Sequence, residues 1–352
     1  MKLIITPNDT LNFGRGKPSA KGEESFLAEM FPPYPSVFLG ALRGLYLSMN
    51  PEDTKKANQT DDPTLGFTIK HYSLMLKNNL YFPAPTDYVW YDNSLHTLQL
   101  KKNEQNKRLS SLTLPYYLWT DHNGKVAPTE GRWVSIDTLR SYISDTPDNI
   151  DSVKLSDYYD REAHVGIARS IQTRTVEQSM LYNINMTRVK DLKFAIETDT
   201  DGKMLQDNGL LKLGSHNKSA RYESNDFNCD IPPQIGSIFK LYLATPAIFR
   251  LGWKPDIEES YGLDLIAAAV GGYDNIGGYN MRANKSDPTS RAGPKPMRRA
   301  VKAGSVYYYK LRKDTPENRT EIIEKLHGRL ISEERKNEGF GLCYIGNVKG
   351  EI

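Results

Sequence analysis

Apolar residues occur in this chain only in short runs, which limits the elements that it can form. The nearest approach to a long apolar segment, residues 263–270, has less than half of the about 18 residues that a membrane-spanning helix requires. The amino-terminal run, residues 2–5, is too short for the core of a signal peptide and is followed by Pro7. The sequence therefore predicts a cytoplasmic protein that does not contact a membrane.

The first part of the chain predicts a strand, a glycine-rich loop and a helix in that order. Residues 2–5 have the β-branched composition of a strand, and residues 11–22 are polar and rich in glycine. Residues 36–47 carry apolar side chains at helical spacing behind Ser36, which we expect to be the N-cap. Residues 51–64 are polar and rich in turn formers, which predicts a loop.

The middle of the chain is dominated by strand-like alternation. Residues 74–89 predict a pair of strands, and residues 165–189 alternate in the way that is typical of a β-hairpin. We expect a further strand at 192–196 and a short helix at 204–213 that ends at Gly214. Residues 133–160 are acidic and predict irregular structure.

A domain boundary is expected near Pro232 and Pro233, which divides the chain into 1–232 and 233–352. In the second part, residues 238–248, 305–311 and 341–348 predict strands, residues 263–270 a buried helix or strand, and residues 316–330 an amphipathic helix. Strands outnumber helices in both parts. The sequence thus predicts an α+β protein with two sheets, each backed by helices.

Charge is unevenly distributed along the chain, although the net charge is only +3. Residues 279–313 contain ten Lys and Arg but one acidic residue, Asp287, whereas residues 130–162 contain eight acidic and four basic residues. Such an asymmetry is typical of a surface that meets a polyanion, and nucleic acid is the first candidate. A solvated basic loop would show the same pattern.

Catalytic and metal-binding patterns are missing from the sequence. The glycines of residues 271–278 lack the spacing of a dinucleotide-binding loop, and the six histidines include no pair four residues apart. Cys229 and Cys343 lie far apart and form no CxxC motif. The sequence therefore predicts no catalytic residues, no metal and no cofactor.

Features that suit single-stranded RNA are better represented. Loops with glycine let phosphates approach the backbone, as in residues 14–17, 293–299 and 339–341. Tyr307, Tyr308 and Tyr309 lie in a predicted strand flanked by basic residues, where aromatic rings could stack on bases, although we expect most of them in the core.

Six segments in one order resemble a known family along nearly the whole chain. They are PSVFLGALRG, LYFPAPTDYVW, VGIARSIQTRTVEQSMLYNINMTRV, LGSHNKSARYE, AGSVYYYKL and NEGFGLCYIG. This family is subunit three of the Cmr complex, the type III-B CRISPR RNA-guided effector, a RAMP protein related to the fifth Cas family. Residues 51–64 and 134–160 carry no part of the resemblance, and we expect them to be loop insertions.

The resemblance implies two ferredoxin-like (RRM-like) RAMP domains with an inserted β-hairpin. It implies a non-catalytic role in antiviral defense: the chain would bind the 5′ handle of the CRISPR RNA and join the large polymerase-cyclase subunit to the backbone RAMP subunits, and would meet target RNA only indirectly. Positions that match the family's motifs, together with the basic stretch, give the predicted RNA-binding residues. They are Arg15, Lys17, Arg43, Arg174, Thr175, Tyr182, Arg221, Lys295, Arg298, Arg299, Gly339 and Gly341.

Some of these positions depart from the family's pattern or have a second explanation. Ser179 replaces a glycine of the family pattern, which puts the backbone freedom expected there in doubt. Ser215 and His216 replace a glycine and a glutamate of that pattern. Arg43 could equally form a salt bridge that caps its helix.

Three alternative functions remain open. The chain could be a metal-independent RAMP endoribonuclease that processes CRISPR repeat RNA, with His164 or His216 as general base. It could be the equivalent subunit of the type III-A complex. It could also be a scaffold that contacts only proteins.

Overall fold

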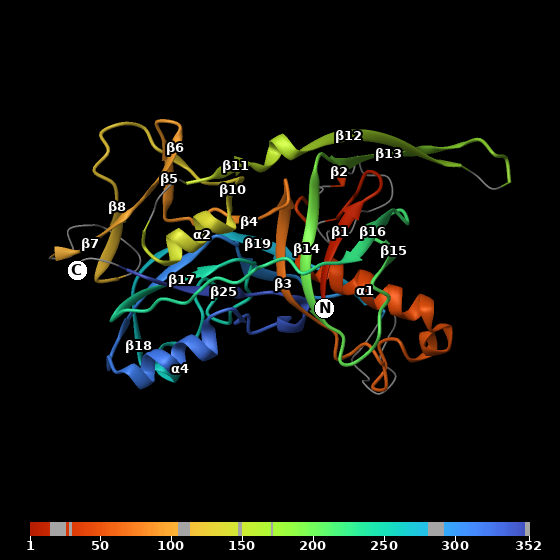
Figure 1. Ribbon diagram of the computed structural model, residues 1–352. Helices are drawn as coiled ribbons and strands as arrows, with labels where there is room; N and C mark the ends of the chain where they lie inside the picture. Colours follow the sequence, from red (N-terminus) through yellow and green to blue (C-terminus); the bar gives the residue numbers. More distant parts are fainter. Residues whose placement is uncertain are drawn as a thin grey trace. The chain divides into compact units, whose positions relative to one another are not determined.

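The computed structural model describes residues 1–14, 26–27, 30–104, 113–146, 150–169, 172–280 and 292–348 of the chain (Figure 1). Helices and mostly antiparallel strands are mixed along the whole chain, so the predicted mixed α and β architecture is confirmed. Two compact units can be distinguished, and each is built from three separate stretches. Unit 1 comprises Met1–Ile69, Ser156–Asn225 and Asn275–Arg298, and unit 2 comprises Lys70–Leu155, Asp226–Asp274 and Arg299–Ile352. The predicted division at residue 232 stays a prediction.

Four antiparallel strands form the sheet of unit 1. Their order is β14 (Leu192–Asp199), β1 (Lys2–Pro7), β16 (Ser219–Ser224) and β15 (Asn208–Lys212). Helix α1 (Pro35–Met49) buries Phe38, Leu42 and Tyr46, which are four residues apart and so lie on one helix face. The ring of Phe38 lies 5.0 Å from that of Phe194 in β14, which places α1 against the sheet.

The start of α1 and the segment before β16 differ from the predictions. The helix begins at Pro35 with Tyr34 as N-cap, so Ser36 lies in the first turn. Proline is favoured at this position because an N–H group in the first turn would have no acceptor within the helix. Residues 208–212 form strand β15 instead of a helix. Each residue of β15 pairs with β16, and Leu211 is buried opposite Ala220, so pairing with a distant strand outweighed the local helical pattern.

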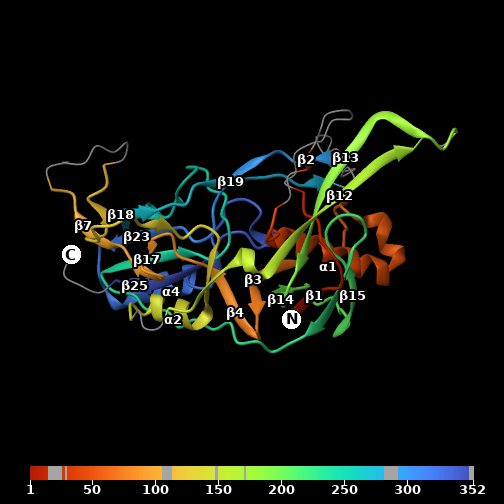
Figure 2. The same ribbon diagram turned by 90° about the horizontal axis from the view of Figure 1, so that it is seen from above.

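The predicted hairpin is present in unit 1. Strands β12 (Tyr159–Arg169) and β13 (Val176–Val189) are antiparallel from Tyr159 opposite Val189 to Arg169 opposite Val176, with an irregularity before Arg169. Both views show the two strands side by side along their length (Figures 1 and 2). A short strand, β2 (Phe26–Leu27), pairs in parallel with β13.

Unit 2 contains a first set of strands with a helix that was not expected. The strand order is β11 (Ser152–Lys154), β10 (Arg132–Ser135), β4 (Asn79–Pro83) and β3 (Thr68–Leu76). Helix α2 (Ile136–Ile143) is N-capped by Ser135 and buries Leu139, Tyr142 and Ile143. The prediction of irregular structure over 133–160, and of a loop over 134–160, is therefore wrong. The acidic residues dominate the composition of this stretch, so its pattern did not indicate the short helix with an apolar face.

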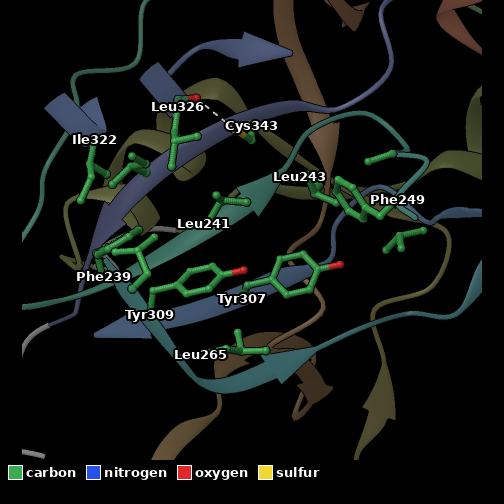
Figure 3. Close-up of a cluster of buried hydrophobic side chains, with 14 of the residues drawn as sticks. Phe239, Leu241, Leu243, Phe249, Leu265, Tyr307, Tyr309, Ile322, Leu326 and Cys343 are labelled. Carbon is green, nitrogen blue, oxygen red and sulfur yellow. Dashed lines mark hydrogen bonds between the residues drawn. The ribbon is translucent and has the colours of Figure 1, made fainter. Parts of the chain in front are cut away.

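The second sheet of unit 2 is antiparallel and has five strands. Their order is β18 (Leu263–Ala269), β23 (Val306–Leu311), β17 (Ile238–Leu243), β25 (Leu342–Asn347) and β24 (Arg329–Leu330). The helices that accompany it are α3 (Glu258–Tyr261), between β17 and β18, and α4 (Pro316–Leu326), between β23 and β25. The apolar face of α4 packs into a core that includes Leu241, Tyr307, Tyr309, Ile322 and Leu326 (Figure 3).

Two predictions for this region are resolved by the sheet. Residues 263–270 contain a strand, β18, and not a helix. The helix predicted over 316–330 ends at Leu326, because Gly328 adopts a left-handed conformation (φ 65°) and the chain then turns back into β24. Tyr307, Tyr308 and Tyr309 are all buried, in agreement with the expected core position.

Shorter elements complete the described part of the chain. In unit 2, β5 (Tyr88–Tyr91), β6 (Ser94–Thr97), β7 (Gln99–Lys102), β8 (Tyr116–Trp119) and β9 (Ala127–Pro128) form two small sheets, and we call residues 88–128 the side arm. Between β18 and β23 lie β19 (Tyr273–Ile276), β20 (Tyr279–Asn280), β21 (Gly293–Pro294) and β22 (Arg298–Val301). Three 3-10 helices are η1 (Pro51–Lys56), η3 (Leu155–Tyr158) and η4 (Lys336–Glu338). Within the described residues, no helix is long and apolar enough to cross a membrane.

Candidate nucleic-acid interface

Three segments meet beside the end of β1 in unit 1, and two of them, in β13 and the turn 214–218, carry the sequence resemblance. The first is residues 8–14, which follow β1. The second is β13: Leu11 pairs with Thr187 of this strand, and the side-chain amide of Asn12 donates a hydrogen bond of 2.8 Å to the carbonyl of Asn185. The third is the turn 214–218, where the hydroxyl of Ser215 donates to the side-chain carbonyl of Asn12 at 2.8 Å. We call this junction the β1-end cluster.

Backbone geometry makes the junction tight. Gly214 has φ 76°, and a Cβ atom on it would lie 2.7 Å from the carbonyl oxygen of Asn12. Only glycine fits such a close approach in this conformation. The glycine in LGSHNKSARYE therefore has a structural reason, because it lets the turn lie directly against residues 8–14.

Charged side chains surround the β1-end cluster in an alternating network. Asp9 pairs with Lys218 and lies 3.9 Å from Arg188, and Arg188 pairs with Glu162 on the neighbouring strand. The hydrogen bond from Lys218 lowers the pKa of Asp9, and the one from Arg188 lowers that of Glu162. Both carboxylates are therefore ionised at neutral pH, and each is held against a cation. His164, a nominee for a general base, has its Nε2 3.6 Å from Glu162.

The predicted residues of this unit lie at different places. Arg221 is exposed on β16, where it is opposite Thr6 of β1 and Leu210 of β15. Arg174 and Thr175 are exposed between β12 and β13; Arg174 has φ 56°, and the hydroxyls of Thr173 and Thr175 are 2.8 Å apart. His216, the other nominee for a base, is exposed in the turn with φ 58°. The side chains of Arg15, Lys17 and Tyr182 lie outside the described residues.

Arg43 connects α1 to the loop that follows it. Its guanidinium donates to Asp62 at 2.6 Å, to Thr64 at 2.7 Å and to Asn58 at 3.2 Å. The Asp62 side chain is fully buried. Burial alone would raise the pKa of Asp62, but hydrogen bonds from Thr64 and Asn58 and the charge of Arg43 together lower it. Arg43 thus stabilises the 58–64 loop, and its contact with RNA stays a prediction.

The glycine loop before β25 packs against unit 2 itself. Gly339 and Gly341 are both buried with left-handed φ angles of 90° and 83°. The carbonyl of Gly339 accepts a hydrogen bond of 2.9 Å from Thr245, and a Cβ on Gly341 would lie 2.2 Å from the amide nitrogen of Ser332. Close approach of the chain's own backbone therefore explains these glycines, and their predicted contact with RNA stays a prediction.

The basic stretch places cations beside exposed aromatic rings. Arg298 and Arg299 are exposed on β22, and the guanidinium of Arg299 lies 4.9 Å from the ring centroid of Tyr273, which is 53% exposed. Lys295 is partly buried, and its amide donates to Gly278 at 2.9 Å. Arg and Tyr planes in this arrangement offer both a charge for phosphates and a face for bases.

A second stacked pair, in unit 2, was not expected from the sequence. The guanidinium of Arg132 lies 3.1 Å from the ring centroid of Trp90. Lys302 connects this pair to the Tyr273 region. Its ammonium pairs at 3.0 Å with Glu130, two residues before Arg132, and its backbone amide donates at 3.1 Å to Gly272, which precedes Tyr273. Trp90 belongs to the motif LYFPAPTDYVW, but nothing in the local pattern connects it to Arg132, which lies 42 residues later.

Comparison with known proteins identifies the family. The family model of the CRISPR-associated protein (Cas_Cmr3) matches residues 3–348. The chain belongs to the Cas_Cmr3 family. The resemblance to this family inferred from the six sequence segments is thereby confirmed.

Solved structures similar to this Cas_Cmr3 member have low sequence identity. A chain of the cryo-EM structure of the type III-B Cmr-beta bound to cognate target RNA is 17% identical, with 92% of each chain covered and a TM-score of 0.51, so the two share a fold. A second such structure, with cognate target RNA and AMPPnP, is 17% identical over 88% of this chain and 86% of that one, with a TM-score of 0.49. The crystal structure of a type III-A Csm3-Csm4 subcomplex gives 13% identity over 89% and 94%, with a TM-score of 0.41. No curated protein matches the sequence.

Proposed function

We propose that this Cas_Cmr3 member is a non-catalytic RNA-binding subunit of a type III-B CRISPR effector, which holds the 5′ handle of the CRISPR RNA. It would join the large polymerase-cyclase subunit to the backbone RAMP subunits. The observation that carries the proposal is the β1-end cluster, where two segments of the family pattern, in β13 and the turn 214–218, meet residues 8–14 next to the basic side chains of Arg188 and Lys218. A Cmr chain of the same fold belongs to a structure that contains target RNA.

The proposed binding mode is a clamp on the RNA backbone. Lys and Arg side chains and loop amides would hold phosphates of the single-stranded handle, and some bases would lie against Tyr or Arg planes such as Tyr273 and Arg299. The β12–β13 hairpin, with Arg174 and Thr175 at its turn, would deflect the strand where the guide sequence begins. No bond of the RNA is broken in this role.

Two ferredoxin-like domains are part of the proposal. In unit 2, the elements β17, α3, β18, β23, α4 and β25 follow one another along the chain, and their strands lie in the order β18, β23, β17, β25. A split βαβ fold has this chain order and this strand order. It supports the assignment for the second domain; the corresponding assignment for the first rests on the family resemblance.

Co-purified RNA tests the proposed function. The chain is co-expressed with the neighbouring subunits, and the RNA that the complex retains is sequenced. We expect RNAs that share one repeat-derived 5′ end, because a clamp on the handle selects that end. RNAs with random 5′ ends, or a complex without RNA, would contradict the proposal. Affinity for handle RNA should also fall with salt, with a log–log slope of about 0.7 per contacted phosphate.

A further inference from the structure

Three aromatic rings form a continuous stack in the side arm of unit 2. The ring centroids of His96 and Tyr91 are 3.8 Å apart, and those of Tyr91 and His122 are 3.7 Å apart. Both pairs have an interplanar angle of 19°. The three rings come from β5, from β6 and from the segment after β8, so tertiary structure assembles the stack.

Two local features hold the rings in this position. Asp92 and Asn93 both have left-handed φ angles, 48° and 56°, as in the tight turn that joins two antiparallel strands, and this turn places Tyr91 next to β6. A Cβ atom on Gly124 would lie 2.7 Å from Nε2 of His122. The glycine therefore leaves the room that the imidazole occupies.

The outer end of the stack is accessible. His122 is exposed. Within the described residues, Tyr91 stacks with His96 of β6 and with His122 of the segment after β8, so Tyr91 is the middle ring. Asp121, next to His122, accepts a hydrogen bond from Nε1 of Trp119 at 3.0 Å and pairs with Lys101 at 2.6 Å. The indole of Trp119, 36% exposed, is thus held by the residue that precedes His122.

The charge of this region favours a polyanion. Among the described residues of 99–125, three are basic (Lys101, Lys102 and Lys125) and two are acidic (Glu104 and Asp121). Lys125 is an exposed cation three residues after His122. Stacked rings beside lysines are the combination by which proteins hold single-stranded nucleic acid, with bases on the rings and phosphates on the cations.

We propose that the outer face of His122 takes an unpaired RNA base as the fourth layer of the stack. The planes of the three rings are within 19° of each other from one layer to the next, so the outer ring offers a flat face of the kind on which single-stranded bases stack. The side arm is then a second RNA contact, separate from the residues assigned to the handle. This inference rests on the proposed function in one respect, because the RNA is the one held by the assembled complex.

Photo-crosslinking of the assembled complex tests the inference. Cells that co-express the subunits are fed 4-thiouridine and irradiated, and the peptides that carry RNA are identified by mass spectrometry. We expect an adduct within residues 88–128. His122→Ala should lower this adduct at least about fivefold, which is the lower end of what one stacked base contributes to binding. His122→Phe should retain it, because a flat ring remains.

Controls separate this inference from the proposed function. Met204→Ala changes a side chain of unit 1 that is 88% exposed and lies outside the proposed RNA-binding residues, and it should leave the side-arm adduct unchanged. An equal adduct in wild type and His122→Ala, or adducts in unit 1 with none in the side arm, would overturn the side-arm contact and leave the handle anchor standing. A crosslink from this arm to a neighbouring protein in place of RNA would also overturn it. A wild-type complex without RNA would overturn both.

Discussion

The carboxylate of Asp87 accepts a hydrogen bond from the hydroxyl of Tyr308, which lies 221 residues further along the chain. The same oxygen accepts a bond of 2.7 Å from Tyr142 of α2. Beside it, the buried ammonium of Lys240 lies 3.8 Å from the ring centroid of Tyr142 and 3.2 Å from Asp145. This polar network explains why the segments LYFPAPTDYVW and AGSVYYYKL belong together: they meet in the interior of unit 2.

Loss of the Asp87 carboxylate should destabilise the protein strongly. In Asp87→Ala, the hydroxyls of Tyr142 and Tyr308 lose their acceptor, and Lys240 loses a nearby opposite charge. Because these groups are buried, we expect the free energy of unfolding to fall by about 3–5 kcal/mol. Urea unfolding measures it. Asp226→Ala, at an exposed site, serves as the control and should change the value by less than about 0.5 kcal/mol. Equal values for the two variants would contradict a structural role of the network.

The Arg43–Asp62 pair should make the free energy of unfolding depend on pH in the acidic range. The pKa of Asp62 is lowered in the folded state, so its contribution to stability is present above its unfolded pKa of about 3.9 and is lost as the pH falls through the folded pKa. Asp62→Asn should remove this part of the pH dependence. Unfolding curves between about pH 5 and pH 2 test this, and an unchanged acid transition would refute it.

Arg43→Ala separates a structural role from RNA binding. The substitution removes the donor to Asp62, Thr64 and Asn58, and we expect a loss of about 1–3 kcal/mol because Asp62 keeps its other hydrogen bonds. RNA retention by the assembled complex, measured at a temperature where the variant is folded, should be close to that of wild type. A large loss of RNA without a loss of stability would assign Arg43 to the RNA instead.

Gly341→Ala should be far more costly than a comparable change in open space. At Gly341 the added Cβ would meet the backbone of Ser332, in addition to the left-handed φ of 83°. Gly328 has φ 65° with nothing within 4 Å of the added atom, so Gly328→Ala isolates the conformational cost of about 1–2 kcal/mol. We expect Gly341→Ala to exceed it by at least about 2 kcal/mol in thermal or urea unfolding. Similar losses would show that the loop shifts easily.

Charge reversal at Arg298 and Arg299 should weaken RNA retention without unfolding the protein. Both are exposed, and the change removes two cations and the guanidinium over Tyr273. The matched control is Lys325→Glu with Lys336→Glu, two exposed lysines of unit 2 with the same change in charge. RNA that co-purifies with each complex is quantified. Equal retention in the two double variants would reduce this stretch to a solvated surface.

The proposed lack of catalysis is tested with repeat RNA. We expect the purified chain to leave CRISPR repeat RNA intact in the presence of a chelator. Specific cleavage that disappears in His164→Ala or His216→Ala would instead establish a metal-independent endoribonuclease. Either histidine variant should otherwise have the stability of wild type, because both side chains are exposed.

The sequence by itself determined the family, the mixed strand and helix composition, the β12–β13 hairpin and the tyrosine-rich strand β23. These depend on local periodicity and on the order of motifs, which a linear pattern records. It failed at β15 and α2, where pairing with β16 and burial against a sheet outweighed local composition.

Only the tertiary structure decided which side chains serve the fold and which lie on the surface. Arg43 and Gly341 are predicted RNA contacts from the sequence, and the structure shows that they also have neighbours within the fold, Asp62 and Ser332. The Arg132–Trp90 pair and the three-ring stack of Tyr91 had no local signal at all. Such partners are chosen by long-range packing, because side chains far apart in the sequence interact only once the strands that carry them have been brought together.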